Sequence, residues 1–303
     1  MMTQLRDLRH YYLDLPLWAC GCRTSGRWSR MRDYLEPDAA PFEAGIRYLY
    51  SSCGKDIGQA ELDQAVERAL QIKAARESDA FACLGSGSLS PRYEIEGLEH
   101  LQAAMIHKRP IMLLTGHIGS FYTVSVALAQ AGITASSLAR SVAPSNPYPR
   151  RSFEHTNYFL TGRRMKGDWI YTNYAGKLDR RLVSVCREGG MLVVLLDLPR
   201  SLFPAGRWPV NFLGRPSSLT GRTVELGLKY NALFLTAWNT IQVESGYGFR
   251  RCLRIEPQLA DEGGVDGILQ QYADRLTSLV SREPWQWMAA PVAAQFNEGG
   301  ANE

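Results

Sequence analysis

One stretch decides the fold of this chain: YEIEGLEHLQAAMIHKRPIMLLTGH, residues 93–117. Its first four residues predict a short strand, and the residues that follow predict a helix and a turn. The apolar run IMLL (111–114) shows no alternation of polar and apolar side chains, which is typical of a strand covered on both faces. Strand, helix, turn and buried strand in this order indicate an α/β sheet whose strands run largely parallel.

The same alternation of helix and buried strand continues to the end of the chain. Residues 117–132 predict a helix that stops at Gly132, since glycine commonly ends helices. Residues 135–140 predict the next strand. Two helix-and-strand pairs and a long closing helix are predicted at 177–197, 220–238 and 267–287. We therefore expect an α/β fold with a mostly parallel central sheet flanked by helices.

The first 90 residues predict an N-terminal helical arm. In the segment 61–84, apolar residues recur at steps of three and four, which is the spacing of an amphipathic helix. The sequence GSGSLSP (85–91) interrupts this pattern and predicts a hinge. We expect the arm over 1–90, an α/β domain over 91–292 and a flexible tail over 293–303.

Composition excludes several classes of protein. The net charge of +4 is modest and no basic stripe with interleaved aromatic residues occurs, which argues against a nucleic-acid partner. The chain has neither a glycine-rich phosphate loop nor clustered metal ligands, so neither a cofactor nor a metal is expected. Its six cysteines are scattered, and we interpret them as free thiols in a reducing compartment, the cytoplasm.

Contact with a membrane is left open by the sequence. No apolar run reaches the roughly 20 residues that span a bilayer. Near the N-terminus, Leu5, Leu8 and Tyr12 recur at helical spacing beside arginines. This pattern fits an interfacial helix at the inner membrane face. It also fits a helix packed on its own domain, which is the interpretation that we favour.

Two segments resist the helix-and-strand pattern, residues 142–167 and 199–218. Both are rich in proline, arginine and aromatic residues, and long irregular loops in compact domains are usually functional. Both follow predicted strand ends, where open α/β sheets place their ligand crevice. His155, within the first segment, is therefore a candidate for substrate binding.

His117 is the strongest candidate for chemistry. It stands directly after a buried strand and before a predicted helix, so its imidazole should lie at the carboxyl edge of the sheet, near the positive end of a helix dipole. Histidine is the side chain best suited to accept a proton at neutral pH. A structural histidine held by backbone groups is the alternative, and position alone does not decide between them.

Four blocks of the sequence carry a resemblance to a known family. They resemble, in the right order, motifs of the lysophospholipid acyltransferase superfamily, and most closely the lauroyl and myristoyl transferases that complete lipid A. The resemblance spans about 93–292. The blocks are YEIEG to GHIGSFY (93–122), SSLARSVAPSNPYPRR (136–151), VVLLDLPRS to LTAWN (193–239) and REPWQWMAAP (282–291).

The resemblance implies a mechanism and also exposes a departure from it. In the family, the histidine is a general base on the acceptor, and a carboxylate five residues later orients it. Here that position holds Tyr122, whose phenol carries no charge at neutral pH. Asp197 matches the aspartate of the family's D-Q block, so we expect it to be the partner of His117, with Tyr122 fixing the ring by a hydrogen bond.

Three explanations of the altered motif stay open. Asp197 replaces the missing carboxylate, or the acceptor is easier to activate than a sugar hydroxyl, such as an amine, or catalysis is lost and only binding remains. The terminal H-R-R-F-type sequence of the family is also replaced by MAAPVAAQF (288–296), and its N-terminal membrane helix is reduced to the remnant LPLW (15–18).

The substrate-binding residues follow from the same resemblance. Arg140 matches the arginine of the Y-R-P block and is expected to neutralise a phosphate or an oxyanion. Arg163 and Arg164 are expected to do the same, with solvated surface residues as the alternative. Gly119 and Ser120 are predicted to contact the substrate, although glycine in such a turn often has a purely conformational role.

The sequence thus predicts an acyltransferase. Its acyl donor would be a thioester of acyl carrier protein or coenzyme A, acting as co-substrate, and its acceptor a hydroxyl or amine of a glycolipid of the lipid A type. One alternative is a soluble enzyme of natural-product biosynthesis that acylates or condenses an intermediate bound to a carrier protein. A second is an inactive relative that binds lipid or a partner protein.

Overall fold

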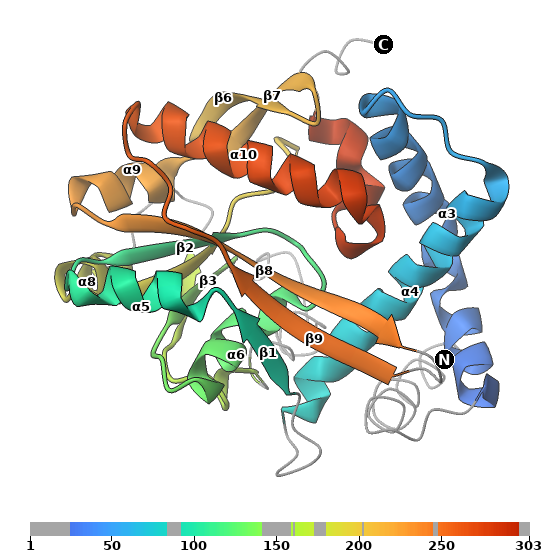
Figure 1. Cartoon of the computed structure of the whole chain (residues 1–303), viewed down its shortest axis with the longest axis horizontal. Helices are drawn as coiled ribbons and strands as arrows, with labels where there is room; N and C mark the ends of the chain where they lie inside the picture. Colours follow the sequence, from blue (N-terminus) through green and yellow to red (C-terminus); the bar gives the residue numbers. More distant parts are fainter. Residues whose placement is uncertain are drawn as a thin grey trace, which may run out of the picture.

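The computed structural model describes residues 25–83, 92–140, 159, 161–172, 180–201, 203–244 and 248–296. A seven-stranded sheet in the order β1-β9-β8-β2-β5-β3-β4 forms the centre of the molecule (Figure 1). Its strands are β1 (Tyr93–Glu96), β2 (Ile111–Thr115), β3 (Ser136–Arg140), β4 (Trp169–Thr172), β5 (Met191–Leu195), β8 (Leu233–Glu244) and β9 (Gly248–Ile255). The predicted α/β class, with a mostly parallel sheet and N-terminal helices, is confirmed.

Five adjacent strands, β8 to β4 in the sheet order, all run parallel. Within the described strands of this seven-stranded sheet, β9 pairs antiparallel with β8, and β1 then runs parallel to β9. The sequence did not predict β9, because Arg250, Arg251 and Arg254 obscure its pattern. In the structure Arg250 and Arg254 point outward, and the residues between them are buried.

Helices cover both faces of the sheet, as two separate hydrophobic clusters show. Met112 and Leu114 of β2 pack toward one face, and Ile111 and Leu113 toward the other. The first face is covered by α8 (Arg180–Arg187), α9 (Arg222–Lys229) and α10 (Gly264–Arg282). The second face is covered by α5 (Leu98–Ile106) and α6 (Val124–Gln130). Every residue of β2 is buried, as its apolar sequence predicts.

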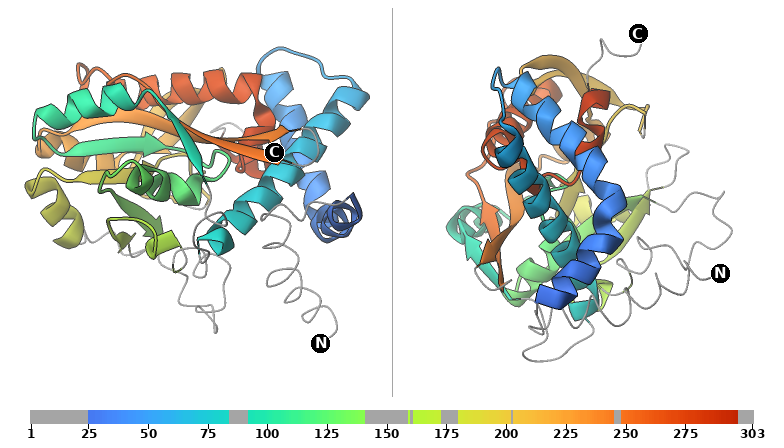
Figure 2. Two further views of the ribbon diagram at one scale, coloured as in Figure 1. Left: turned by 60° about the horizontal axis from the view of Figure 1, so that its bottom comes forward. Right: turned by 90° about the vertical axis from the view of Figure 1, so that its right-hand side faces the viewer.

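The N-terminal helices are α3 (Ser25–Ser52) and α4 (Gln59–Ala82). They lie side by side at the end of the sheet where β8 finishes (Figures 1 and 2), and α4 contacts β8. Leu35 of α3 and Leu70 of α4 belong to the same hydrophobic cluster as Tyr272 of α10. The arm therefore shares the core of the α/β domain. The predicted hinge at 85–91 lies outside the described residues.

The segment 199–218 is less irregular than the sequence suggests. Strands β6 (Arg207–Phe212) and β7 (Arg215–Thr220) form an antiparallel hairpin. Its turn residues, Leu213 and Gly214, both have positive φ, as a two-residue turn of type I′ requires. Pro209 and Pro216 concealed this hairpin, because proline is tolerated only where a strand has a free edge. Of the segment 142–167, only 159 and 161–167 are described.

The end of the chain corrects one further expectation. Short 3-10 helices, η5 (Pro284–Gln286) and η6 (Ala290–Phe296), follow α10. The predicted flexible tail begins at residue 293, yet Ala293 and Phe296 are buried, and the Phe296 ring packs against Phe212 and Trp287. Among the described helices, none combines the length and apolarity that a bilayer crossing requires.

Candidate active site

His117 and Asp197 follow two neighbouring parallel strands. β2 ends at Thr115 and β5 ends at Leu195, and these two residues are register partners. Both side chains therefore lie at the carboxyl edge of the sheet. A tight turn, in which the Ile118 amide donates to the Gly116 carbonyl at 2.7 Å, presents the histidine at this edge.

The two side chains form a hydrogen-bonded pair. His117 Nδ1 lies 2.8 Å from Asp197 Oδ1, and the backbone N–H of His117 donates to Asp197 Oδ2 at 2.7 Å. Asp197 is completely buried, whereas 22% of the His117 side-chain surface is exposed. The imidazole is thus oriented from the protein interior while part of the ring stays accessible to a substrate.

A third donor completes the shell of Asp197. The indole Nε1–H of Trp287 donates to Asp197 Oδ2 at 2.7 Å. An ionised carboxylate only accepts hydrogen bonds. Here its donors are the His117 backbone N–H, the Trp287 indole N–H and the His117 imidazole. The proton of the neutral imidazole is consequently on Nδ1, and Nε2 carries the lone pair that a general base needs.

Close packing surrounds the pair. A Cβ atom at Gly116 would lie 2.9 Å from Asp197 Oδ2 and 3.1 Å from the Tyr272 hydroxyl, so glycine permits this approach. The Tyr272 hydroxyl donates to the Thr115 carbonyl at 2.8 Å. Burial and the negative charge of Asp197 raise the pKa of Tyr272, so this phenol stays protonated and acts as a donor.

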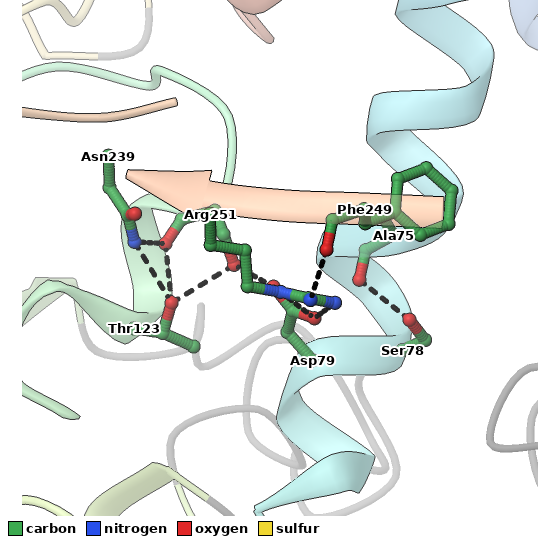
Figure 3. A network of polar contacts seen from close by, with 8 residues as sticks. Ala75, Ser78, Asp79, Thr123, Asn239, Phe249 and Arg251 are labelled. Atoms are coloured by element: carbon green, nitrogen blue, oxygen red, sulfur yellow. Dashed lines mark hydrogen bonds and ion pairs between the residues drawn. The ribbon is translucent and has the colours of Figure 1, made fainter. Parts of the chain in front are cut away.

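A polar network holds the loop of residues 117–123, here called the histidine loop (Figure 3). Ser120 Oγ donates to Asp79 Oδ2 at 2.7 Å, and Asn239 Nδ2 donates to the Ser120 carbonyl at 2.8 Å. Arg251 Nε contacts both carboxylate oxygens of Asp79 at 2.8 Å. Burial disfavours the charge of Arg251, but Asp79 outweighs it and raises the pKa of the guanidinium.

The backbone of the histidine loop is paired as well. The Gly119 amide donates to the Gln286 carbonyl at 2.8 Å, and the Ser120 amide donates to the Asn239 carbonyl at 3.1 Å. Both residues are buried, so the substrate contacts predicted for Gly119 and Ser120 do not fit this structure. Gly119 instead has a conformational role, because its φ is +48° and a Cβ atom would lie 2.3 Å from the Asn239 carbonyl oxygen.

A family model matches most of the chain. The model of the family described as bacterial lipid A biosynthesis acyltransferase matches residues 72–289. The chain belongs to this family. The resemblance predicted from sequence blocks is thereby confirmed. Among proteins of curated function, no match was found. The part that matches the lipid A acyltransferase family begins within α4, upstream of the blocks noticed in the sequence, and includes Asp79.

Tyr122 stands where the sequence resemblance leads us to expect a carboxylate. Its side chain is half-buried, and its ring packs on Phe121 with centroids 4.1 Å apart. Phe121 in turn meets the His117 ring edge-on at 4.6 Å. In this lipid A acyltransferase relative, the carboxylate on the imidazole comes from Asp197, and the Phe121 ring packs against the imidazole itself.

The predicted basic residues are distributed differently. Arg140 ends β3, the neighbour of β5, so its backbone lies at the same sheet edge as the pair. Arg163 and Arg164 are exposed, which favours the surface alternative. The Arg164 Nε donates to the Cys83 carbonyl at 2.7 Å, and the Arg163 guanidinium lies over the Phe159 ring. His155 lies outside the described residues.

Sequence reasoning missed Asp79, Arg251 and Trp287. A signal for Asp79 was present, because it follows Ile72 and Ala75 at helical spacing and therefore lies on the apolar face of α4. A charged residue on such a face indicates a buried partner.

The predicted start of the helix after His117 was wrong. Helix α6 begins at Val124, so His117 is not at its N-terminus.

Three buried thiols are poorly suited to act as nucleophiles. Burial raises the pKa of Cys83 to about 12 and those of Cys186 and Cys252 to about 11, so these three thiols stay protonated at neutral pH. In the same part of the chain, no group of three or more His, Cys, Asp or Glu side chains could hold a metal ion.

Proposed function

We propose that this protein transfers an acyl group from a thioester of acyl carrier protein or coenzyme A to a hydroxyl or amine of a glycolipid of the lipid A type. The observation that carries the proposal is the 2.8 Å contact between His117 Nδ1 and Asp197 Oδ1, with Asp197 fully buried. Membership of an acyltransferase family supports the same reaction class.

In the first step, His117 is the general base. Its Nε2 takes the proton of the acceptor O–H or N–H while the acceptor atom attacks the thioester carbonyl carbon. The new bond to carbon forms as the carbonyl π electrons move to oxygen. Asp197 holds the ring in the tautomer that this step needs and offsets the positive charge of the imidazolium that forms.

In the second step, the tetrahedral intermediate collapses. The carbonyl reforms, the C–S bond breaks, and the imidazolium returns its proton to the leaving sulfur. The products are an ester or amide and a free thiol. The histidine therefore ends in its starting state.

The negative oxygen of the intermediate needs a donor. The backbone N–H groups of His117, Gly119 and Ser120 already donate hydrogen bonds within the protein. None of these three groups is therefore available to stabilise the oxyanion. We assign this task to the Arg140 guanidinium, since Arg140 ends a strand at the same sheet edge. Arg140→Lys, which keeps the charge without the fork of donors, should then lower kcat less than Arg140→Ala.

The altered motif does not require an inactive protein. A buried carboxylate on Nδ1 supplies what the missing motif residue would supply, which supports the first of the three explanations for Tyr122. Burying a charge costs free energy unless the charge is fully paired. A relative without catalysis would not need a buried carboxylate with three N–H donors at this position.

The test is acyl transfer followed by mass spectrometry. Wild type, His117→Ala and the control His100→Ala, which changes a partly exposed histidine on α5, would be incubated with acyl carrier protein and coenzyme A thioesters and a panel of lipid and amine acceptors. We expect transfer by wild type and by His100→Ala, and none by His117→Ala. Binding of a thioester without turnover by any of the three proteins would overturn the proposal.

The acceptor and the liposome binding of the protein distinguish the pathways. Transfer to a glycolipid together with binding to liposomes supports a lipid A-type reaction. Transfer to a soluble amine, with binding to carrier protein and no affinity for liposomes, would instead support the soluble natural-product enzyme.

A further inference from the structure

The segment that follows α10 runs along the histidine loop. Trp287 and Ile118 form an antiparallel backbone bridge. The Met288 amide donates to the His117 carbonyl at 2.7 Å, and the Gly119 amide donates to the Gln286 carbonyl at 2.8 Å. Backbone contacts from this one segment therefore fix His117 and Gly119, the two residues on either side of Ile118.

The side chain of Trp287 reaches the other member of the pair. Its indole N–H donates to Asp197 Oδ2 at 2.7 Å, and the residue is completely buried. Phe212 packs edge-on against this ring, with centroids 5.7 Å apart, and Phe296 packs against it in a tilted arrangement at 5.4 Å. The N–H group thus points in one direction set by packing.

We infer that Trp287 is a positioning residue: its indole N–H holds the Asp197 carboxylate in the orientation that the imidazole requires, while the backbones of its neighbours Gln286 and Met288 hold the loop at Gly119 and His117. Oδ2 receives the indole and the His117 amide, which leaves Oδ1 for Nδ1. The kinetic part of this inference rests on the proposed function. Its structural part does not.

The chain offers a matched control for the test. Trp238 is also buried, with 1% of its surface exposed, and its Nε1 has no hydrogen-bond partner in the part of the chain that the structure describes. Trp287→Phe and Trp238→Phe make the same chemical change at two buried sites. Only the first removes a hydrogen bond to a charged group, so a difference between them reports that bond.

Two measurements on the full chain are needed. In steady-state kinetics with an acyl carrier protein thioester, we expect Trp287→Phe to lower kcat about 10- to 100-fold with little change in KM, the range for losing one hydrogen bond to a charge. Trp238→Phe should leave kcat within about threefold of wild type. In NMR spectra of protein labelled with ¹⁵N-histidine, the Nδ1–H signal of His117 should shift or broaden only in Trp287→Phe.

The outcomes separate this inference from the proposed function. Equal effects of the two substitutions, or an unchanged His117 Nδ1–H signal in Trp287→Phe, would overturn the positioning role. If wild type turns over no thioester, the proposed function fails, and the NMR signal still tests the positioning role. If Trp287→Phe does not fold, the indole N–H signal of Trp287 is followed in Asp197→Asn, and an unchanged signal there overturns the inference.

Discussion

Asp79 and Arg251 form a buried ion pair although they are 172 residues apart in the chain. Asp79 lies on α4 of the N-terminal arm and Arg251 on β9 of the sheet (Figure 3). Asp79 also accepts the hydrogen bond of Ser120 Oγ in the histidine loop. The arm is therefore part of the support of the active site, which agrees with a family match that begins within α4.

Breaking this ion pair should destabilise the protein strongly. Arg251→Met leaves the carboxylate of Asp79 buried without its cation, and such losses cost about 3–5 kcal/mol. Urea unfolding measures the change. Glu96→Gln is the control, because it breaks the pair of Glu96 with Arg254, whose side chains are about half exposed, and should cost under about 1 kcal/mol. Equal costs of the two changes would contradict the structural importance of the buried pair.

The partner of His117 can be identified by two substitutions. Asp197→Asn places an amide where Nδ1–H needs an acceptor and removes the charge that offsets the imidazolium, so kcat should fall about 10³- to 10⁴-fold, as in hydrolases with a comparable pair. Tyr122→Phe should change kcat less than about tenfold, because Asp197 already orients Nδ1. A larger loss in Tyr122→Phe than in Asp197→Asn would return the orienting role to Tyr122.

How far the sequence alone reaches can be judged at this pair. His117 and Asp197 each follow an apolar run without alternation, and this local signal is enough to place both at the carboxyl edge of a parallel sheet. The order of the strands is not local information. Local patterns do not show that β2 and β5 are neighbours. The resemblance suggested Asp197 as the partner of His117, and the fold shows that the two side chains meet.

The residues that sequence reasoning missed depend on such long-range order. Trp287 reaches Asp197 across 90 positions of the chain, and Asp79 reaches Arg251 across 172. The hairpin of β6 and β7 was missed for a different reason. Its free edges tolerate the prolines that normally exclude a strand, so local propensity pointed away from the structure that forms.

The stability of the protein should fall at alkaline pH through Cys83. Burial raises the pKa of this thiol to about 12 from an ordinary value near 9. The unfolded chain therefore loses the proton first, and the stabilisation that is complete below pH 9 is lost as the pH rises toward 12. From pH 8 to pH 10, the free energy of unfolding of Cys83→Ala should fall by about 1 kcal/mol less than that of wild type. Urea unfolding under reducing conditions measures both values. Parallel losses in the two proteins would exclude Cys83 as the cause.

The conformation of the histidine loop can be tested at Gly119. Its φ of +48° alone would cost an alanine about 1–2 kcal/mol, and the added Cβ atom would also lie 2.3 Å from the Asn239 carbonyl oxygen. Gly54→Ala is the matched control, because Gly54 has a φ of +67° and no described atom lies within 4 Å of the added Cβ. We expect Gly54→Ala to cost only the backbone strain, with activity unchanged, whereas Gly119→Ala should cost more and displace His117 from Asp197. Urea unfolding and kcat are measured for both variants, and equal effects on both quantities would show that the close approach of the loop to β8 is not needed.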